Sequence, residues 1–398
     1  MASKKTIEIV KATAPVLKLH GEAITKVFYQ LLFEKHPELK DVFNMVNQQK
    51  GTQQKALANA VFKYAVYIEK LEMMKGELEN IAQKHVSLSI PKEAYPIVGE
   101  NLLLAIKKVL GDAATPEIME AWEEAYNDLA VLLTDREEEL YETKEKSSGG
   151  FRGMEDFVVA KKVKENSNIT SFYLKRKDGT PVPHFIPGQY VAVMVDIPES
   201  EHKHTRNYSL SDTNTKDYLR LSIKKEIGNP NGIVSNYMHA KMNVNSILKV
   251  GMPSGNFVLK NTEKPIVLIS GGIGITPLLS MLKGLPKKPT NITFIQCVLN
   301  SEHQVFDIEL NNQFNDASQF VKVFSAPLVT DVIGENYDYK GFFNSQILKD
   351  LQISNNSDFY FCGPTPFMSC VLKELEEFNV KNENINYEFF GPAEELMN

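Results

Sequence analysis

A glycine-rich turn interrupts the apolar segment 266–282, which reads IVLISGGIGITPLLSML. The turn residues are Gly271, Gly272, Ile273, Gly274, Ile275 and Thr276. Glycines let the backbone approach an anion closely, and the free amides and dipole of a following helix favour a phosphate there. We expect Thr276 to cap the helix and Pro277 to lie in its first turn. The pattern indicates nucleotide binding, although a merely tight strand-to-helix turn has the same composition.

A second turn of this kind lies near the C-terminus, where the strand-like residues 359–361 lead into Cys362, Gly363 and Pro364. Strand-like runs at 292–298 and 320–324 lie between the two turns. Two strand-turn-helix units predict a parallel, doubly wound sheet with its ligand at the C-terminal ends of the strands. We therefore expect a nicotinamide nucleotide across the two turns.

Polar and aromatic residues suited to a flavin precede the first turn. They are Tyr190, the RNYS run of Arg206, Asn207, Tyr208 and Ser209, and the helix start with Gly232, Val234 and Ser235. An arginine pairs with a pyrophosphate, a tyrosine ring packs flat on a tricyclic ring, and a serine hydroxyl bonds to a ring nitrogen or carbonyl. Each residue is alternatively an ordinary part of a β-barrel. Their order before the glycine turn favours FAD.

These segments resemble the ferredoxin-NADP reductase-like family in the motifs PGQY, RNYS, GGIGITP, YFCGP and FFGP, over residues 157 to the end. The resemblance implies FAD on a six-stranded barrel and an aromatic residue over the flavin, with Phe390 in that place. The terminal motif comprises Phe389, Phe390, Gly391 and Pro392. Residues 300–303 contain an acid for ribose hydroxyls and no arginine for a 2'-phosphate, which favours NADH and leaves NADPH open.

The N-terminal half contains a histidine on an apolar helical face. In GELENIAQKHVSLSI, residues Leu78, Ile81, Ala82 and His85 recur at helical spacing. Such a histidine is either a satisfied core residue or a ligand, and a neutral imidazole is a good ligand of haem iron.

This half resembles a globin, and the whole chain, from about residue 6 to 392, is similar to the bacterial flavohaemoglobins. The resemblance implies that His85 is the proximal ligand of a haem b iron and that Phe43 packs on the porphyrin. It implies that Tyr29, Gln53 and Leu57 form the distal wall. A phenol in an apolar pocket can donate to the partly negative oxygen of bound dioxygen, but Tyr29 is alternatively a core aromatic residue.

The resemblance also assigns Tyr95 and Glu137 to a hydrogen-bonded relay with the proximal histidine. A carboxylate that accepts the second N–H of the histidine makes the ligand more electron-donating, which favours oxygen activation. Glu137 is one of three consecutive glutamates, and the residues alone do not distinguish it from a solvated acidic run. Lys84 and Glu388 match positions near the facing edges of haem and flavin, where they would tune the redox potentials; alternatively both are surface charges.

Three domains are needed to position these residues. Residues 6–145 have a helical pattern with breaks at 36–37, 51–52, 90–91 and 115–116, and a charged, Ser/Gly-rich stretch follows. Short alternating runs then predict an antiparallel barrel. We predict a multidomain chain: an all-α globin, an antiparallel six-stranded β-barrel and an α/β parallel-sheet nucleotide-binding domain. The boundaries are 1–145 for the globin haem domain, 146–155 for the linker, 156–262 for the FAD-binding barrel and 263–398 for the NAD(P)-binding domain.

The composition excludes several classes of protein. A formal net charge of -6 over 398 residues argues against nucleic-acid binding, which needs a basic face. The three cysteines have neither metal-site spacing nor a disulfide framework, which fits the reduced cytoplasm. No apolar run approaches the roughly 18 residues of a membrane span. We expect a cytoplasmic monomer without a transmembrane segment.

The resemblance implies an NAD(P)H-dependent nitric oxide dioxygenase that removes nitric oxide under nitrosative stress. NADH or NADPH reduces FAD, FAD reduces the haem iron, and haem-bound O2 oxidises nitric oxide to nitrate. One alternative is a haem gas sensor or oxygen carrier with a self-reducing module. Another is a peroxide-handling electron-transfer oxidoreductase. Whether the distal pocket takes a lipid or an azole stays open.

Overall fold

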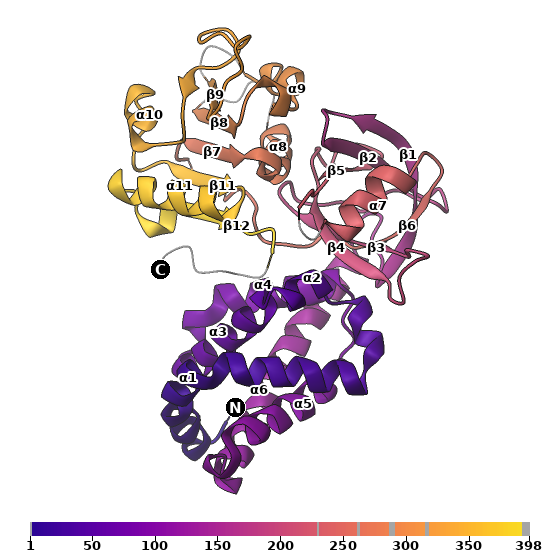
Figure 1. Cartoon of the computed structure of the whole chain (residues 1–398), viewed down its shortest axis with the longest axis vertical. Helices are drawn as coiled ribbons and strands as arrows, with labels where there is room; N and C mark the ends of the chain where they lie inside the picture. Colours follow the sequence, from indigo (N-terminus) through magenta and orange to yellow (C-terminus); the bar gives the residue numbers. More distant parts are fainter. Residues whose placement is uncertain (1, 229–230, 261–262, 286–290, 315–317, 392–398) are drawn as a thin grey trace. The chain divides into compact units, whose positions relative to one another are not determined.

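The computed structural model describes residues 2–228, 231–260, 263–285, 291–314 and 318–391 (Figure 1). Its internal contacts divide the chain into two compact units, residues 1–154 with 192–206 and residues 155–191 with 207–398. Within the described ranges, no helix has the length and apolar character needed to cross a membrane.

The N-terminal 145 residues are helical, as expected. The predicted breaks end or begin helices: Gly51 adopts a left-handed φ of 76° before α3, and Pro116 takes the first position of α6, where Thr115 caps the amide of Ile118. The elements are α1 (Lys4–Lys35), η1 (Pro37–Asp41), α2 (Met45–Gln49), α3 (Thr52–Tyr67), η2 (Leu71–Met74), α4 (Lys75–Ser87), α5 (Ala94–Leu110), η3 (Gly111–Ala113) and α6 (Pro116–Glu145).

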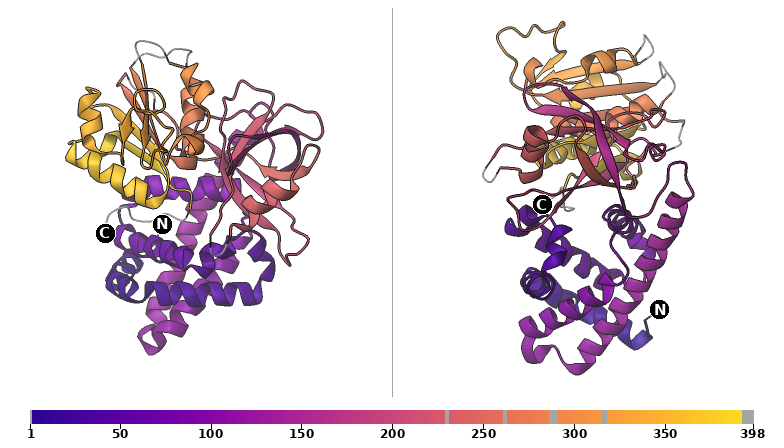
Figure 2. Two further views of the ribbon diagram at one scale, coloured as in Figure 1. Left: turned by 45° about the horizontal axis from the view of Figure 1, so that its top comes forward. Right: turned by 90° about the vertical axis from the view of Figure 1, so that its right-hand side faces the viewer.

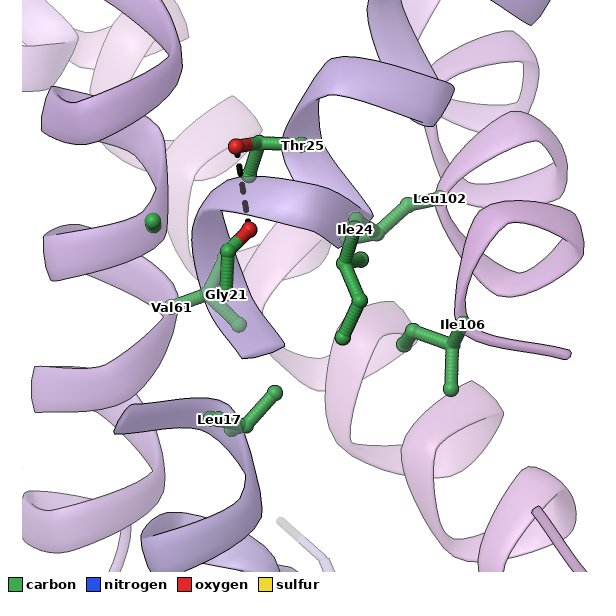
Figure 3. A pocket seen from close by; sticks show the side chains of 8 residues that line it. Leu17, Gly21, Ile24, Thr25, Val61, Leu102 and Ile106 are labelled. Carbon is green, nitrogen blue, oxygen red and sulfur yellow. Dashed lines mark hydrogen bonds between the residues drawn. The ribbon is translucent and has the colours of Figure 1, made fainter. Parts of the chain in front are cut away.

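The close approach of α1 to α3 depends on Gly21, because a Cβ there would lie 3.2 Å from the Cβ of Ala58. A small apolar pocket lies at this crossing, and the Thr25 hydroxyl beside it donates to the Gly21 carbonyl at 3.0 Å (Figure 3). The pocket is lined by Leu17, Gly21, Ile24, Thr25, Ala58, Val61, Leu102 and Ile106. From this crossing, α1 continues toward Tyr29, and Leu57 directly precedes Ala58 on α3.

The predicted six-stranded antiparallel barrel is confirmed. Its strand order is β4-β3-β6-β1-β2-β5, and the bridge between Leu210 and Leu221 joins the two ends of the order, so the sheet nearly closes on itself (Figure 2). Its elements are β1 (Met154–Lys164), β2 (Ile169–Arg176), β3 (Tyr190–Val195), β4 (His204–Ser209), β5 (Leu219–Lys224), α7 (Ile233–Lys241) and β6 (Ile247–Gly251).

The predicted parallel sheet is also confirmed, with the strand order β10-β9-β8-β7-β11-β12. The order reverses between β7 and β11, which is where doubly wound sheets bind their ligands. The elements are β7 (Ile266–Gly271), η4 (Gly272–Gly274), α8 (Ile275–Gly284), β8 (Ile292–Val298), η5 (Ser301–His303), α9 (Asp307–Asn311), β9 (Gln319–Phe324), β10 (Tyr339–Lys340), α10 (Ser345–Asp350), β11 (Asp358–Cys362), α11 (Thr365–Glu377), η6 (Asn382–Asn384) and β12 (Ile385–Glu388).

Helices cover both faces of this sheet. Leu268, Phe294 and Tyr360 pack with α8 and α9 in one apolar cluster, whereas Ile269 and Phe361 pack with α10 and α11 in another. Burial on both faces explains why these strands are continuous apolar runs instead of alternating ones.

Candidate functional site

Three helices bring His85, Tyr95 and Glu137 together. The Nδ1 atom of His85 on α4 lies 2.8 Å from Oε1 of Glu137 on α6 and 2.9 Å from the hydroxyl of Tyr95 on α5. The Tyr95 hydroxyl donates to the same carboxylate oxygen at 2.5 Å. Burial, together with the adjacent carboxylate, raises the pKa of Tyr95 above its ordinary value. The phenol therefore stays protonated and remains a donor.

The structure distinguishes Glu137 from its two acidic neighbours. Glu137 is 3% exposed, whereas Glu138 and Glu139 are exposed and pair with arginines on the surface. A carboxylate only accepts hydrogen bonds, so the proton of a neutral His85 lies on Nδ1. No residue in the described ranges hydrogen bonds to Nε2, which leaves its lone pair available to a metal.

The distal candidates lie on α1, on α3 and in the connection between them. Tyr29 is 5% exposed, and its ring meets that of Phe43 edge-on at a centroid distance of 5.7 Å. Gln53 and Leu57 are half-buried. Burial raises the pKa of Tyr29, and the side-chain hydrogen bonds of Gln53 and Gln48 offset part of that rise. Tyr29 is therefore a buried phenol with polar neighbours.

Gln48 and Gln54 were missed by sequence reasoning. Gln54 Nε2 donates to Oε1 of Gln48 at 2.9 Å, and Gln48 is 8% exposed. The Gln48 side chain also hydrogen bonds to the Tyr29 hydroxyl, so the two amides extend the polar surroundings of this phenol. The available signal was the two pairs of glutamines at 48–49 and 53–54, since α2 is too short to show a period.

The flavin candidates lie on neighbouring strands and on one helix. Tyr190 begins β3, and the residues 206–209 end β4. The rings of Tyr190 and Tyr208 and the side chain of Arg206 are half-buried, Asn207 is exposed, and Ser209 is buried. Half-buried aromatic rings can pack on a flat ligand while the barrel holds their other face.

The N-terminus of α7 has no side-chain cap in the part of the chain that the structure describes. Gly232 caps α7 without a side chain, so no side chain occupies the amides of its first turn. A Cβ at Gly232 would lie 2.6 Å from Oγ of Ser235 and 2.7 Å from Cβ of Glu226, so no larger residue fits. Val234 and Ser235 are buried, and the Ser235 hydroxyl accepts the amide of Glu226 at 3.1 Å.

The two predicted phosphate turns meet at the switch point of the sheet. Strands β7 and β11 are parallel neighbours with Ser270 opposite Cys362. A Cβ at Gly274 would overlap the carbonyl of Cys362, and a Cβ at Gly271 would lie 2.6 Å from the ring of Phe367. Only glycine permits this approach. Gly363 and Pro364 follow β11, and Gly272 has a left-handed φ of 52°.

The predicted cap of α8 was wrong. The cap is Gly274, and Thr276 is the second residue of the helix, where its hydroxyl donates to the carbonyl of Ile273 at 3.1 Å. The η4 turn therefore leaves the amides before α8 without a capping side chain. This arrangement suits a bound phosphate better than a threonine cap.

The remaining candidates have less defined surroundings. Lys84 and Glu388 are half-buried rather than exposed. Burial raises the pKa of Glu388 to about 8, and its Oε2 atom has no hydrogen-bond partner. Phe389 packs against the sheet, Phe390 is 50% exposed, and Gly391 is exposed. Pro392 lies outside the described residues.

Three family models together match most of the chain. The globin model matches residues 26–131, the oxidoreductase FAD-binding domain matches 156–259, and the oxidoreductase NAD-binding domain matches 268–373. The flavohemoprotein of Oceanobacillus iheyensis is 46% identical over 403 residues, which cover 100% of this chain and 98% of that protein.

Two solved structures are similar. The flavohemoglobin of Malassezia yamatoensis, determined with bound FAD and heme, has a TM-score of 0.84 and 26% identity, over 98% of this chain and 99% of its own. The flavohem-like FAD/NAD-binding domain of nitric oxide dioxygenase from Vibrio cholerae has a TM-score of 0.55 and 31% identity, over 61% of this chain and 100% of its own.

Proposed function

Because this chain belongs to the flavohemoprotein family, we propose that it is an NAD(P)H-dependent nitric oxide dioxygenase. It converts nitric oxide and dioxygen to nitrate, with one electron from the dinucleotide for each nitric oxide. The observation that carries this proposal is the buried Glu137 on Nδ1 of His85, at 2.8 Å. This partner makes the imidazole electron-donating, which suits oxygen activation better than simple oxygen storage.

The residues fit a haem. His85 offers a free Nε2, and the candidate distal side chains are a buried phenol, a phenylalanine, a leucine and amides. When bound, haem and FAD would supply hydride acceptance, one-electron transfer and the reaction of dioxygen with nitric oxide.

The residues of the helical part then have separate tasks. Glu137 fixes the tautomer and orientation of His85, and Tyr95 holds Glu137. Tyr29 stays protonated and would donate a hydrogen bond to a partly negative oxygen, while Gln53 and Gln48 hydrogen bond to its hydroxyl. Phe43 and Leu57 keep water from this space because they are apolar.

The residues of the reductase part also fit their proposed ligands. The rings of Tyr190 and Tyr208 would hold the flat face of FAD, Ser209 would bond to its ring, and Arg206 with the start of α7 would hold its pyrophosphate. The glycine turn at 271–274 and the Cys362-Gly363-Pro364 turn would hold the dinucleotide. Lys84 and Glu388 would tune the two redox potentials, and Phe390 would cover the flavin.

Several broader expectations belong to the same proposal. We place the protein in the cytoplasm, where the dinucleotide is available and where the three cysteines, which are free in the structure, stay reduced. It acts as a monomer. The domain boundaries remain those given above: 1–145, 146–155, 156–262 and 263–398.

The test is nitric oxide consumption at an electrode in aerated buffer with NADH and added FAD and haem, together with assays of nitrate and NADH. We expect rapid loss, one nitrate for each nitric oxide, and one NADH for each pair of nitric oxide molecules. NADPH in place of NADH determines the preferred dinucleotide.

The alternatives give different results. A sensor or oxygen carrier consumes NADH slowly, and nitric oxide does not accelerate that consumption. A peroxide-handling enzyme turns over with peroxide in the absence of nitric oxide and yields no nitrate. If nitric oxide persists while NADH reduces the haem, the electron path stands but the dioxygenase proposal is wrong.

A further inference from the structure

Four charged side chains form a largely buried cluster in the second unit. Arg220 on β5 donates from Nη1 to Oε1 of Glu309 on α9 at 2.6 Å, and its Nε lies 3.7 Å from Oδ2 of Asp212. Lys283 on α8 bridges the same carboxylates, at 2.5 Å from Asp212 and 2.8 Å from Glu309. Two cations and two carboxylates therefore alternate around one point.

Two members of the cluster are buried, two are partly exposed, and each has an ion-pair partner. The side chain of Arg220 is 1% exposed, that of Asp212 4%, that of Lys283 14% and that of Glu309 33%. The Arg220 guanidinium also donates to the hydroxyl and carbonyl of Ser211. Burial opposes the ionisation of Asp212, but Arg220 and Lys283 outweigh it and hold its pKa below the ordinary value. Removal of one member would leave an uncompensated buried charge.

Each member belongs to a segment next to a proposed cofactor site. Asp212 follows the flavin candidate Ser209 by three residues, and its backbone carbonyl accepts the hydroxyl of Ser280 on α8 at 2.7 Å. Helix α8 carries the glycine turn at its start, and β5 packs against that turn, η4. The side of the cluster formed by Asp212 and Lys283 thus ties the phosphate turn to the flavin sheet.

Through Glu309, the cluster also contacts α9, which follows the loop expected to bind a ribose of the dinucleotide. Glu309 lies on α9, directly after the loop that follows β8 and contains the acid expected to bond a ribose, Glu302. Phe306 in this loop has a left-handed φ of 63°, which is strained for a bulky residue, and the Arg220 guanidinium lies 5.0 Å from its ring centroid. Contacts must hold such a conformation in place.

We propose that Arg220, Asp212, Lys283 and Glu309 are positioning residues that align the dinucleotide with the flavin for hydride transfer. The inference rests on the proposed function. The phosphate turn and the ribose loop are attached through this cluster to the sheet that bears Tyr208 and Ser209. Loss of the attachment displaces the hydride donor while each cofactor keeps its own contacts, and hydride transfer is sensitive to such displacement.

The informative variant is Lys283→Met combined with Glu309→Gln. It removes one cation and one carboxylate, so the remaining Arg220 and Asp212 still pair and no buried charge is left over. Lys322→Met is the matched control, because Lys322 is 16% exposed and pairs with Asp307 at 3.8 Å within the nucleotide-binding part alone. Glu309→Gln alone serves as the milder variant, since Glu309 is partly exposed.

The measurement is anaerobic stopped-flow reduction of the bound flavin by NADH and by deuterated NADH, with hydrogen exchange of residues 275–284 and 299–311 in the full-length protein. We expect the double variant to keep its haem, its FAD and the NADH concentration for half-saturation. We expect its hydride-transfer rate to fall by about 10- to 100-fold, with faster exchange in both segments. Glu309→Gln should show a smaller loss, and Lys322→Met none.

Two results would overturn the inference. In the first, NADH reduces the flavin of the wild-type protein, and the double variant and Glu309→Gln transfer hydride at the same rate as the wild type. The cluster would then only stabilise the fold, and the proposed function would be unaffected. A wild-type protein whose flavin neither NADH nor NADPH reduces would contradict the proposed function and this inference together.

Discussion

At the scale of single residues, the surroundings of a side chain decide its chemistry. Glu137 and Glu138 are adjacent and identical in type, but one accepts hydrogen bonds from His85 and Tyr95 while the other pairs with Arg152 on the surface. Tyr29 is protonated because burial disfavours its charged form. The predictions at this scale therefore concern one atom or one hydrogen bond.

Replacing Tyr29 by Phe removes a hydroxyl and keeps the ring. We expect the haem to remain, and oxygen to dissociate from the reduced protein about tenfold faster, since one hydrogen bond contributes about 1–1.5 kcal/mol. Stopped-flow displacement of oxygen by carbon monoxide measures the rate. Phe33→Leu, a nearby aromatic change without a hydroxyl, is the control. An unchanged rate for Tyr29→Phe would show that Tyr29 is only a core aromatic residue and does not contact bound oxygen.

Replacing Glu137 by Gln keeps the shape of the side chain and removes the negative charge that lies beside Nδ1 of His85. A neutral amide is a weaker acceptor, so the imidazole becomes less electron-donating. We expect a more positive haem potential, a lower iron–histidine stretching frequency and about 10- to 100-fold less activity. Potentiometry and resonance Raman spectroscopy test this expectation. Glu138→Gln should change none of the three, and equal effects of the two variants would contradict the assignment.

At the scale of elements, the nucleotide site depends on how closely two strand ends meet. The turn after β7 and the turn after β11 come together because β7 and β11 are parallel neighbours at the point where the strand order reverses. Glycine at 274 leaves no side chain between them. The same logic operates in the helical part, where Gly21 allows α1 to approach α3.

The variant Gly274→Ala tests the contact between the turns. Its Cβ would overlap the backbone of Cys362, which cannot move aside as a side chain could, so the two turns must separate. We expect FAD and haem to remain and NADH-driven flavin reduction to fall at least about tenfold, with a stability loss of about 1–3 kcal/mol. Stopped-flow reduction and thermal unfolding measure both.

The control for that substitution is Gly76→Ala on α4, where a Cβ meets nothing within 4 Å. An alanine there should leave flavin reduction unchanged and stabilise the helix by about 0.5–1 kcal/mol. Normal reduction in Gly274→Ala would show that the dinucleotide does not bind across the two turns.

At the scale of the whole molecule, a substitution that removes one cofactor should leave the other cofactor and its partial reaction intact. His85 belongs to the helical part, and Arg206 belongs to β4 of the barrel. Because the proposed electron path runs from dinucleotide to FAD to haem, a substitution at the haem site or at the FAD site should abolish one step and leave another measurable.

We expect His85→Ala to lose haem and nitric oxide consumption while NADH still reduces an artificial one-electron acceptor at the wild-type rate. Arg206→Ala should lose FAD and all NADH-driven haem reduction while chemically reduced protein still binds oxygen. Haem content, flavin content and acceptor reduction distinguish the two. Normal haem in His85→Ala, or normal flavin in Arg206→Ala, would remove the corresponding residue from its proposed role.

The sequence by itself determined the fold class and the order of the three domains, whereas the haem was implied by the resemblance to the flavohaemoglobins. The fold class and domain order follow from contiguous residues: glycine turns between strands and helices, period-2 runs in the barrel, and breaks at proline and glycine between helices. Local backbone preference and hydrophobic period set such features, so they can be read without knowing what packs on them.

Only the tertiary structure decided which groups meet. His85 and Glu137 are 52 residues apart, and Arg220 and Glu309 are 89 apart. The residues alone therefore could not choose among three glutamates, of which the family resemblance singled out Glu137, and they did not reveal Gln48 and gave a wrong cap for α8. Burial and partnership depend on the approach of distant segments, which a local pattern does not specify, and they determine whether a carboxylate is a solvated charge or a working group.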